Sequence, residues 1–495
     1  MTSLERIPQP RIDKLQSLKD RCVDPYPARF QRTHTNAEAV ALLVKQEEAQ
    51  AQPAEAVVAG RIMAIRGMGK LSFIDIIDGS GKLQLYVNKS KLDEASAELL
   101  KDLDIGDFLG AAGVMVRTRT LEPSVDVTTL TILSKSLQPL PEKWHGLQDT
   151  EKRYRQRYLD LIANPEVREV FRRRSRIISA MRGFLDKQGF LEVETPMLQP
   201  SAGGALARPF ITHHNTLGCD FYLRIALELH LKRLIVGGFD RVYEIGRVFR
   251  NEGIDTRHNP EFTMMEAYQA YADYQDIMKL VEEMVGHIVH DVTGSYTVPF
   301  GEHLIDFTPP WQRLDLRQAV LESSGIDYEA FPDASSLQTE MRRLGYEFDP
   351  SRDRGRLIDD LLSTFLEPKL IQPVFLINYP IDMSPLAKNR PGDLRTVERF
   401  EAYAGCMEVA NAFSELNDPL EQERRFAAQL ESRVDTRRTD TEETEVIDED
   451  FLMALEHGMP PTGGLGIGID RLTMLLTSQP SIREVILFPA LKDKE

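Results

Sequence analysis

The chain has 495 residues, which is too many for one ordinary domain and enough for two or three. Hydrophobic residues make up 42% and charged residues 28%, the balance of a soluble globular protein. The net charge of −17 excludes a protein that binds nucleic acid by indiscriminate attraction, so a polyanion has to meet local basic patches.

Cysteine content and hydropathy restrict the compartment. Cys22, Cys219 and Cys406 are isolated and form no CxxC pair, which argues against a disulfide framework or a zinc site. The chain contains no run of 18 apolar residues and its N-terminus has no apolar signal region. These features predict a cytoplasmic protein that does not interact with a membrane.

The first part of the chain predicts a helical arm followed by a β-barrel. Residues 1–56 are expected to be helical, because 37–52 is rich in Ala, Glu and Gln with apolar residues spaced for one helix face. Three β-type runs, a helical piece and two more β-type runs then follow at 57–63, 71–77, 82–87, 89–102, 108–119 and 124–133. This order predicts an OB-fold barrel over residues 57–137, a fold that binds oligonucleotides across its second and third strands.

A linker is predicted at residues 138–164, because Gln138-Pro139-Leu140-Pro141 interrupts the pattern. Residues 151–176 carry nine Lys and Arg against four acids. Such a segment suits a phosphate backbone or, equally, a solvated helix face with internal ion pairs. Helical and strand-like segments alternate over 165–495, which are expected to form the second domain.

The segment from Tyr243 to Glu266 is the most informative in the sequence. Two β-type runs, 241–249 and 261–266, flank a polar loop, as in an antiparallel hairpin. Arg250 ends the first run, where its planar fork suits a phosphate or carboxylate. The chain has no GxxxxGK[ST] loop and no GxGxxG after a strand, so an ATP site here has to use arginines on a sheet.

This segment resembles motif 2 of the class II aminoacyl-tRNA synthetases. Residues 464–471 (GLGIGIDR) resemble motif 3, and 190–196 (FLEVETP) resemble motif 1. The resemblance extends from about Val57 to Leu491, and the barrel places it in the subgroup for lysine, aspartate and asparagine. It implies an α+β protein, with an anticodon-binding OB-fold barrel before a catalytic domain of antiparallel sheet flanked by helices. Motif 1 further implies a homodimer.

The resemblance also assigns catalytic roles. Arg250 is expected to bridge the amino-acid carboxylate and the α-phosphate of ATP, and Arg471 to lie along the γ-phosphate. The ATP site is expected to comprise Arg250, Glu252, His258, Asn259, Phe262, Glu401 and Arg471, with Phe262 stacked on adenine and Glu252 reading its amino group. Glu401 and Glu408 match the acids that hold Mg²⁺ on the phosphates. Their spacing of seven would place them on opposite faces of one strand unless a bulge intervenes at Gly405.

The amino-acid pocket resembles that of the lysine enzymes in this subgroup. The matching positions are Gly204, Glu228, Glu266, Tyr268, Asn411, Phe413 and Glu415. Its three acids can hold an α-amino and an ε-amino group, whereas an aspartate site needs a cation. The expected reaction is the activation of L-lysine by ATP and its transfer to tRNA(Lys). Phe73, Gln84 and Glu122 match positions that the family uses to bind anticodon bases.

Some relatives differ from this sequence at three positions. Leu227, His230 and Cys406 replace Pro, Tyr and Gly, and Cys406 is expected to add volume between the two proposed metal ligands. Three alternative functions remain open at this point. They are an aspartate or asparagine enzyme of the same subgroup, a lysyl-type transferase that modifies a protein, and a non-catalytic nucleic-acid-binding or regulatory module.

Overall fold

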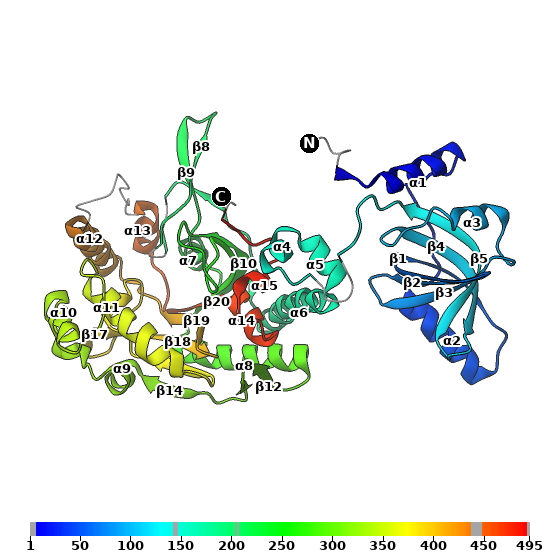
Figure 1. The fold of residues 1–495 in the computed structure, drawn as a ribbon. Helices are drawn as coiled ribbons and strands as arrows, with labels where there is room; N and C mark the ends of the chain where they lie inside the picture. Colours follow the sequence, from blue (N-terminus) through cyan, green and yellow to red (C-terminus); the bar gives the residue numbers. More distant parts are fainter. Residues whose placement is uncertain (1–5, 142–146, 202, 205–206, 437–447, 493–495) are drawn as a thin grey trace. The chain divides into compact units, whose positions relative to one another are not determined.

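The computed structural model describes residues 6–141, 147–201, 203–204, 207–436 and 448–492. The chain divides into two compact units, unit 1 (Met1–Gln148) and unit 2 (Asp149–Glu495). Figure 1 shows a barrel in the first and a sheet with helices in the second. Among the described residues, none of the helices combines the length and the apolar character needed to cross a bilayer.

Unit 1 is a closed five-stranded barrel, which confirms the predicted OB-fold. The strands follow the order β1-β2-β3-β5-β4 around the barrel. Their bounds are β1 (Glu55–Met68), β2 (Leu71–Ile77), β3 (Lys82–Asn88), β4 (Phe108–Arg117) and β5 (Pro123–Ser134), with α3 (Glu94–Leu99) between β3 and β4. Alternate residues such as Ile74, Ile76, Leu83 and Leu85 fill the barrel, so the other face of β2 and β3 is turned outward.

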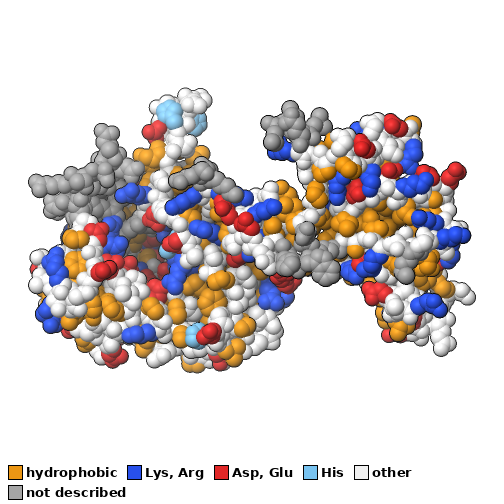
Figure 2. All heavy atoms as spheres, viewed as in Figure 1, with side chains coloured by type: hydrophobic (Ala, Val, Ile, Leu, Met, Phe, Trp, Pro, Cys, Tyr) orange, Lys and Arg blue, Asp and Glu red, His pale blue; other side chains and the backbone are white. Residues whose placement is uncertain are grey.

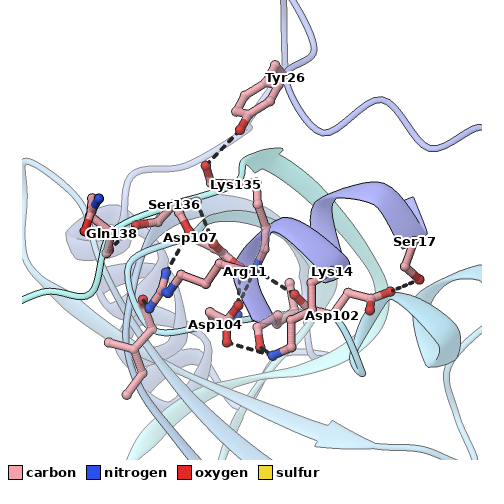
Figure 3. Close-up of polar contacts among 12 residues, drawn as sticks. Arg11, Lys14, Ser17, Tyr26, Asp102, Asp104, Asp107, Lys135, Ser136 and Gln138 are labelled. Carbon is pink, nitrogen blue, oxygen red and sulfur yellow. Dashed lines mark hydrogen bonds and ion pairs between the residues drawn. The ribbon is translucent and has the colours of Figure 1, made fainter. Parts of the chain in front are cut away.

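The N-terminal helices α1 (Gln9–Asp20) and α2 (Asn36–Ala49) belong to this unit instead of forming a separate arm. Leu18 of α1 and Leu43 of α2 are buried in the barrel's hydrophobic core. Figure 3 shows the polar contacts that hold α1: Arg11 donates to the backbone oxygen of Ser136 at 2.7 Å, and Lys14 pairs with Asp104 at 2.7 Å. Within the predicted 1–56 arm, residues 9–20 and 36–49 are helical, residues 1–5 lie outside the described part, and packing on the barrel determines where the two helices lie.

Part of the predicted 138–164 linker is helical. Helices α4 (Thr150–Arg155) and α5 (Arg157–Ala163) are packed on unit 2, and residues 142–146 lie outside the described part. Arg157 is fully buried, pairs with Asp160 at 2.6 Å and donates to the backbone oxygens of Arg483 and Leu487. Arg153 pairs with Glu484 at 2.9 Å. Several cations of the basic 151–176 segment therefore neutralise acids within unit 2.

Unit 2 is built on an eight-stranded sheet in the order β14-β15-β18-β19-β20-β11-β10-β6. Only the two end pairs, β14 with β15 and β6 with β10, are parallel. The strands are β6 (Leu191–Glu192), β10 (Arg241–Phe249), β11 (Glu261–Ala270), β14 (Gln312–Asp315), β15 (Val374–Ile377), β18 (Arg399–Ala404), β19 (Met407–Ser414) and β20 (Thr462–Gly468). This arrangement confirms the predicted antiparallel catalytic sheet.

Helices cover one face of this sheet. Met265 and Ala267 of β11 and Leu465 and Ile467 of β20 share a core with α8. The covering helices are α6 (Pro165–Lys187), α8 (Tyr274–Thr293), α14 (Ile469–Leu476) and α15 (Ile482–Val485). Because side chains alternate along a strand, Glu266 and Tyr268 lie on the opposite face, together with Gly464, Gly466 and Gly468 of β20.

The remaining elements of unit 2 lie around the sheet. Helices α7 (Glu228–Val236) and α13 (Glu449–Glu456) share a separate hydrophobic cluster with Tyr268. The others are α9 (Leu316–Ser324), α10 (Ala334–Arg343), α11 (Arg354–Leu361) and α12 (Pro419–Thr436), with small sheets β7 (Leu198–Gln199), β9 (Cys219–Leu223) and β8 (Ile211–His214), β12 (Thr297–Phe300) and β13 (His303–Asp306), and β16 (Asn389–Arg390) and β17 (Asp393–Val397). On the face seen in Figure 2, acidic and basic side chains are intermingled on both units.

Candidate active site

A cavity of about 310 Å³ lies against strands β11, β19 and β20 of unit 2. Gly466 and Gly468 of β20 form part of its wall, so side chains from the neighbouring strands have room above them. All the residues predicted for ATP and for the metal line this cavity: Arg250, Glu252, His258, Asn259, Phe262, Glu401, Glu408 and Arg471. Asn411, predicted for the amino acid, lines it as well.

Arg250 follows β10, at the start of the loop that connects the two strands of the predicted hairpin. Its guanidinium lies over the ring of Phe262, 5.2 Å from the ring centroid, and its Nε donates to the backbone oxygen of Ile225 at 3.5 Å. Burial lowers the pKa of Arg250, with the charges of Glu252, Glu408 and Glu266 opposing this effect. The cation is thus held in the cavity by a ring and by carboxylates, and none of the described residues forms a close ion pair with it that would block an anionic ligand.

Arg471 enters from the first turn of α14. Its Nη1 donates to Oε2 of Glu408 at 2.9 Å, and its Nη2 is 3.5 Å from Nε2 of His258. Burial lowers the pKa of Arg471, but the adjacent Glu408 outweighs burial and the pKa lies above its usual value. Asp470, the preceding residue, accepts from the Thr263 amide and pairs with Arg174, which anchors α14 against β11.

Two other predicted ATP residues differ in exposure and in the hydrogen bonds that their side chains form. Glu252 is exposed at the cavity. Asn259 is buried, and its amide is engaged at both ends: Nδ2 donates to the backbone oxygen of Glu261 at 2.6 Å, and Oδ1 accepts from the Ala490 amide at 3.1 Å. Asn259 therefore shapes the loop between β10 and β11 whatever else it contacts.

Glu401 and Glu408 lie on the two strands of one hairpin. Glu401 is in β18 and Glu408 in β19, joined by Gly405 and Cys406 with φ of 58° and 60°. Positive φ at both residues is the pattern of a type I′ turn. The register shift falls between Ala402 and Tyr403, not at Gly405. Cys406 occupies the turn, where its Sγ donates to the backbone oxygen of Pro368, so it does not separate the two carboxylates as expected.

These two carboxylates are not equivalent as metal ligands. Oε2 of Glu401 accepts from the hydroxyls of Tyr379 and Tyr403, both at 2.7 Å, and Oε1 accepts from Arg399 at 2.5 Å. A carboxylate oxygen has two lone pairs, so Glu401 retains one acceptor position on Oε1. Oε2 of Glu408 accepts a hydrogen bond from Arg471, and burial together with the charge of Glu401 raises the pKa of Glu408. The pair fits a hard cation that also takes phosphate oxygens.

The predicted amino-acid pocket lies beside this cavity because of the sheet register. Gly464 pairs with Tyr268 on one side and with Phe413 on the other, and Gly466 pairs with Glu266 and with Asn411. Directly paired residues point to the same face of a sheet, so the two glycines leave a trough between these four side chains. Gly204, with φ of 86°, lies where a Cβ would be 3.2 Å from that of Ala226 and 3.5 Å from that of Glu228.

The three acids of the pocket are all buried. Glu228 begins α7, Glu266 lies in β11 and Glu415 directly follows β19. Glu266 accepts from the Leu227 amide at 3.0 Å and from the Tyr268 hydroxyl at 3.1 Å. Burial, with the charge of Glu228, raises the pKa of Glu266 to about 7. Burial also raises the pKa of Glu415 well above its usual value, against the opposing charge of Lys232.

One acceptor in this pocket is buried and has no donor. Oε1 of Glu415 has no hydrogen-bond partner among the described residues, although the side chain is inaccessible to solvent. A Cβ at Gly464 would lie 1.8 Å from this atom, so residue 464 has to be glycine for Glu415 to occupy its position. A buried, unsatisfied carboxylate oxygen costs free energy that an ammonium group of a ligand would recover.

Sequence reasoning missed the residues that hold these acids. Arg399, Tyr379 and Tyr403 fix Glu401, and no spacing in the sequence joins them. Lys232 is fully buried and pairs with both Glu228 and Glu415. The spacing of four residues between Glu228 and Lys232 is a signal that could have found this pair.

In unit 1, Phe73 and Gln84 share the outer face of β2 and β3. Phe73 pairs with Tyr86, with ring centroids 5.5 Å apart, and Gln84 pairs with Asp75. Oε1 of Gln84 accepts from Ser124 at 3.0 Å. Glu122 is exposed and lies two residues before Ser124, which pairs with Gln84 across β3 and β5. The register therefore brings the three predicted anticodon residues to one region of the barrel.

Comparisons with known proteins agree with this division. Residues 149–492 match the family described as tRNA synthetases class II (D, K and N), and residues 56–133 match the OB-fold nucleic acid binding domain. A lysine–tRNA ligase of Dehalococcoides mccartyi is 63% identical, over 98% of this chain and 97% of its own. Lysine–tRNA ligases of Moorella thermoacetica, 52% identical over 98% and 97%, and Shouchella clausii, 50% identical over 98% and 96%, are also similar.

Proposed function

The chain belongs to the class II tRNA synthetases of the D, K and N group, and we propose that it activates L-lysine with ATP and transfers it to tRNA(Lys). The observation that carries the choice of lysine is the buried pocket of three acids, Glu228, Glu266 and Glu415, next to the arginine-lined cavity. Such a pocket attracts an amino acid with two ammonium groups and repels aspartate.

ATP–pyrophosphate exchange tests this assignment. Lysine, aspartate and asparagine are supplied one at a time, and lysine is expected to drive exchange far better than the other two. Exchange driven best by aspartate or asparagine would place the chain with another specificity of its group.

The proposed chemistry needs positioning and charge neutralisation, not a protein nucleophile. The lysine carboxylate attacks the α-phosphate in line, forming lysyl-adenylate and releasing pyrophosphate. Arg250 is proposed to contact both the carboxylate and the α-phosphate, and Arg471 to bind the γ-phosphate. Cations held in fixed positions in the cavity stabilise the charge that develops in the transition state. The terminal ribose hydroxyl of the tRNA then attacks the lysyl carbonyl and displaces AMP.

Glu408 and Glu401 are proposed to hold Mg²⁺ together with phosphate oxygens of ATP. A bound Mg²⁺ would offset negative charge on the phosphates. Glu408 is the stronger candidate for a Mg²⁺ ligand. Two tyrosine hydroxyls and Arg399 already donate hydrogen bonds to the carboxylate oxygens of Glu401 and use most of their lone pairs.

Glu408→Ala is expected to raise the Mg²⁺ concentration needed for half-maximal exchange and to lower the rate. The change also removes the partner of Arg471, so Glu408→Gln is the matched control: its amide oxygen can still accept from Arg471 but is a poorer ligand for Mg²⁺. Both variants should need more Mg²⁺. A requirement unchanged in both would contradict direct ligation.

The activation step is also expected to depend on pH through Glu266. Its folded-state pKa of about 7 means that this carboxyl becomes protonated as the pH falls through 7, and the lysine α-ammonium then loses a negative partner. The kcat/KM for lysine, measured at saturating ATP, should therefore decrease below about pH 7 and be constant above it. Glu266→Gln should lower kcat/KM and remove this acid limb; an unaltered limb in the variant would assign the titration to another group.

The barrel is proposed to bind the anticodon through Phe73, Gln84 and Glu122, by stacking and by edge contacts to unpaired bases. Phe73→Ala is expected to raise KM for tRNA(Lys) by about 5- to 150-fold, from the ~1–3 kcal/mol of one base–aromatic stack. Lysine-dependent exchange should be unchanged. Phe108→Ala removes another aromatic ring of unit 1, from β4 and outside the β2–β3 face, and is the matched control. Equal losses in both variants would contradict a specific role for Phe73.

A homodimer and a cytoplasmic location complete the proposal. Leu191, Met197 and Leu198, in and directly after the motif 1 segment, are each 47% exposed, which suits burial against a second copy of the chain. Cys22, Cys219 and Cys406 are free thiols, as suits a reducing compartment.

A further inference from the structure

Lys232 is a cation built into the proposed lysine pocket. It lies on α7, one helical turn after Glu228, and its side chain is fully buried. Its Nζ forms ion pairs with Oε1 of Glu228 and with Oε2 of Glu415. It is also 5.5 Å from the ring centroid of Phe413 and 5.8 Å from that of Phe451.

A buried lysine of this kind has to be held by strong partners. Burial lowers the pKa of Lys232, but Glu228 and Glu415 outweigh burial and keep the pKa above its usual value. The ammonium therefore carries its charge inside the protein. Phe413 of β19 and Phe451 of α13 add the faces of two aromatic rings, which attract a desolvated cation.

Charge balance shows what this cation does for the pocket. Glu228, Glu266 and Glu415 carry three negative charges when ionised, and lysine brings two positive charges in its ammonium groups. Lys232 supplies the third, so the occupied pocket is neutral. Without Lys232 one buried carboxylate would lack a counter-ion, a strongly unfavourable state in protein interiors that is usually avoided by protonation.

Lys232 and a ligand do not compete for the same oxygen atom of Glu415. Oε2 binds Lys232, whereas Oε1 has no hydrogen-bond donor within the described part of the chain. A substrate ammonium can bind Oε1 while Lys232 remains on Oε2. Lys232 has little room to withdraw, because its side chain is enclosed by Phe413, Phe451 and both acids.

We infer that Lys232 is a positioning residue for lysine recognition: it remains in place as the third cation of the pocket, orients Glu228 and Glu415, and balances charge for a substrate with two ammonium groups. This inference rests on the proposed function. It adds a specificity determinant that acts through the acids and does not touch ATP.

Lys232→Met tests the inference, because methionine fills a similar volume without the charge. The KM for lysine is expected to rise by about 30-fold or more, as when one member of a buried ion pair is removed. KM for ATP and kcat at saturating lysine should change little. The acid limb of kcat/KM for lysine should move up by about 1 pH unit, since the carboxylates lose a neighbouring cation. A merely structural role would lower the active fraction and leave this limb unmoved.

The groups that face this site limit what can titrate. Glu228 shares α7 with Lys232, Glu266 and Tyr268 come from β11, and Glu415 follows β19. The other neighbours, Phe413, Phe451 and Gly464, do not titrate. A shifted limb therefore reports on Glu266 and Glu415, the pocket acids whose pKa values burial raises.

A charge-balanced double variant gives the sharpest outcome. Glu228→Gln alone leaves the occupied pocket with one surplus positive charge, whereas Glu228→Gln/Lys232→Met is neutral again. The double variant is therefore expected to have a kcat/KM for lysine no lower than that of Glu228→Gln alone. This comparison also replaces the single Lys232→Met variant if that protein does not fold, because both ions of the pair are removed together.

Two results overturn the inference while leaving the proposed function intact. One is an unchanged lysine KM and acid limb in Lys232→Met. The other is a double variant that loses, relative to Glu228→Gln, the same factor that Lys232→Met loses relative to the unaltered protein. Failure of lysine to drive exchange in the unaltered protein would instead contradict the proposed function itself.

Discussion

Glu415→Gln is expected to lower kcat/KM for lysine by roughly 30- to several-thousand-fold, from the ~2–5 kcal/mol lost when one partner of a buried, hydrogen-bonded charge pair is truncated. The reason lies in the position of the carboxylate. Oε2 holds Lys232, and Oε1 is buried without a donor among the described residues, so one side chain serves two ammonium groups. An amide has no negative charge to offer either of them.

The effect should appear in lysine recognition and not in nucleotide binding. Lysine-dependent exchange is measured with lysine and ATP varied in turn, and KM for ATP should be nearly unchanged. Glu282→Gln is the matched control, because Glu282 is another buried glutamate of unit 2, which accepts from the Trp311 amide in the packed core. Equal losses in the two variants, or an intact lysine KM in Glu415→Gln, would remove Glu415 from the pocket.

Arg250→Gln is expected to lower kcat for exchange by about 10²- to 10³-fold, the size of effect found when a fixed donor to a developing oxyanion is removed. Arg250 is held over Phe262 with carboxylates nearby but has no close ion pair within the described ranges, so its guanidinium is available to the carboxylate and the α-phosphate. Glutamine can donate a hydrogen bond but carries no charge for the transition state.

Arg247→Gln is the matched control for this variant. Arg247 lies three residues earlier in β10, its side chain is 39% exposed, and its ion partner Glu261 is 3.6 Å away. Exchange by this control should be close to that of the unaltered protein. If both Arg250→Gln and Arg247→Gln keep the kcat of the unaltered protein, groups other than Arg250 stabilise the α-phosphate.

The fold could be predicted closely where local pattern decides it. The five barrel strands follow runs of alternating apolar residues, and β10 and β11 follow the two runs around Arg250. Each of these elements is specified by residues that are neighbours in the sequence. The 150–163 segment was predicted as part of a linker or as a solvated helix face, and its packing on unit 2 was not predicted, because the burial of Arg157 against the backbone of Arg483 and Leu487 depends on a distant part of the chain.

The candidate site was predictable in its residue types but not in its partners. Glu401 and Glu408 were identified, yet their relation depends on a turn at Gly405 and Cys406 and on a register shift that hydrophobic pattern does not encode. In the sequence, Lys232 looks like an ordinary helical lysine between Leu231 and Arg233. Only the folded chain brings Glu415 beside it, and this contact gives the pocket its third cation.

The central claim is tested most directly by charging of tRNA. The full chain, with ATP and Mg²⁺, is given a tRNA(Lys) transcript and labelled lysine, aspartate or asparagine, and acid-precipitable label is followed with time. The account predicts that lysine accumulates on tRNA(Lys) and that neither of the other amino acids does. Absence of lysyl-tRNA from a folded protein that still binds ATP, or a preference for aspartate or asparagine on their own tRNAs, would contradict it.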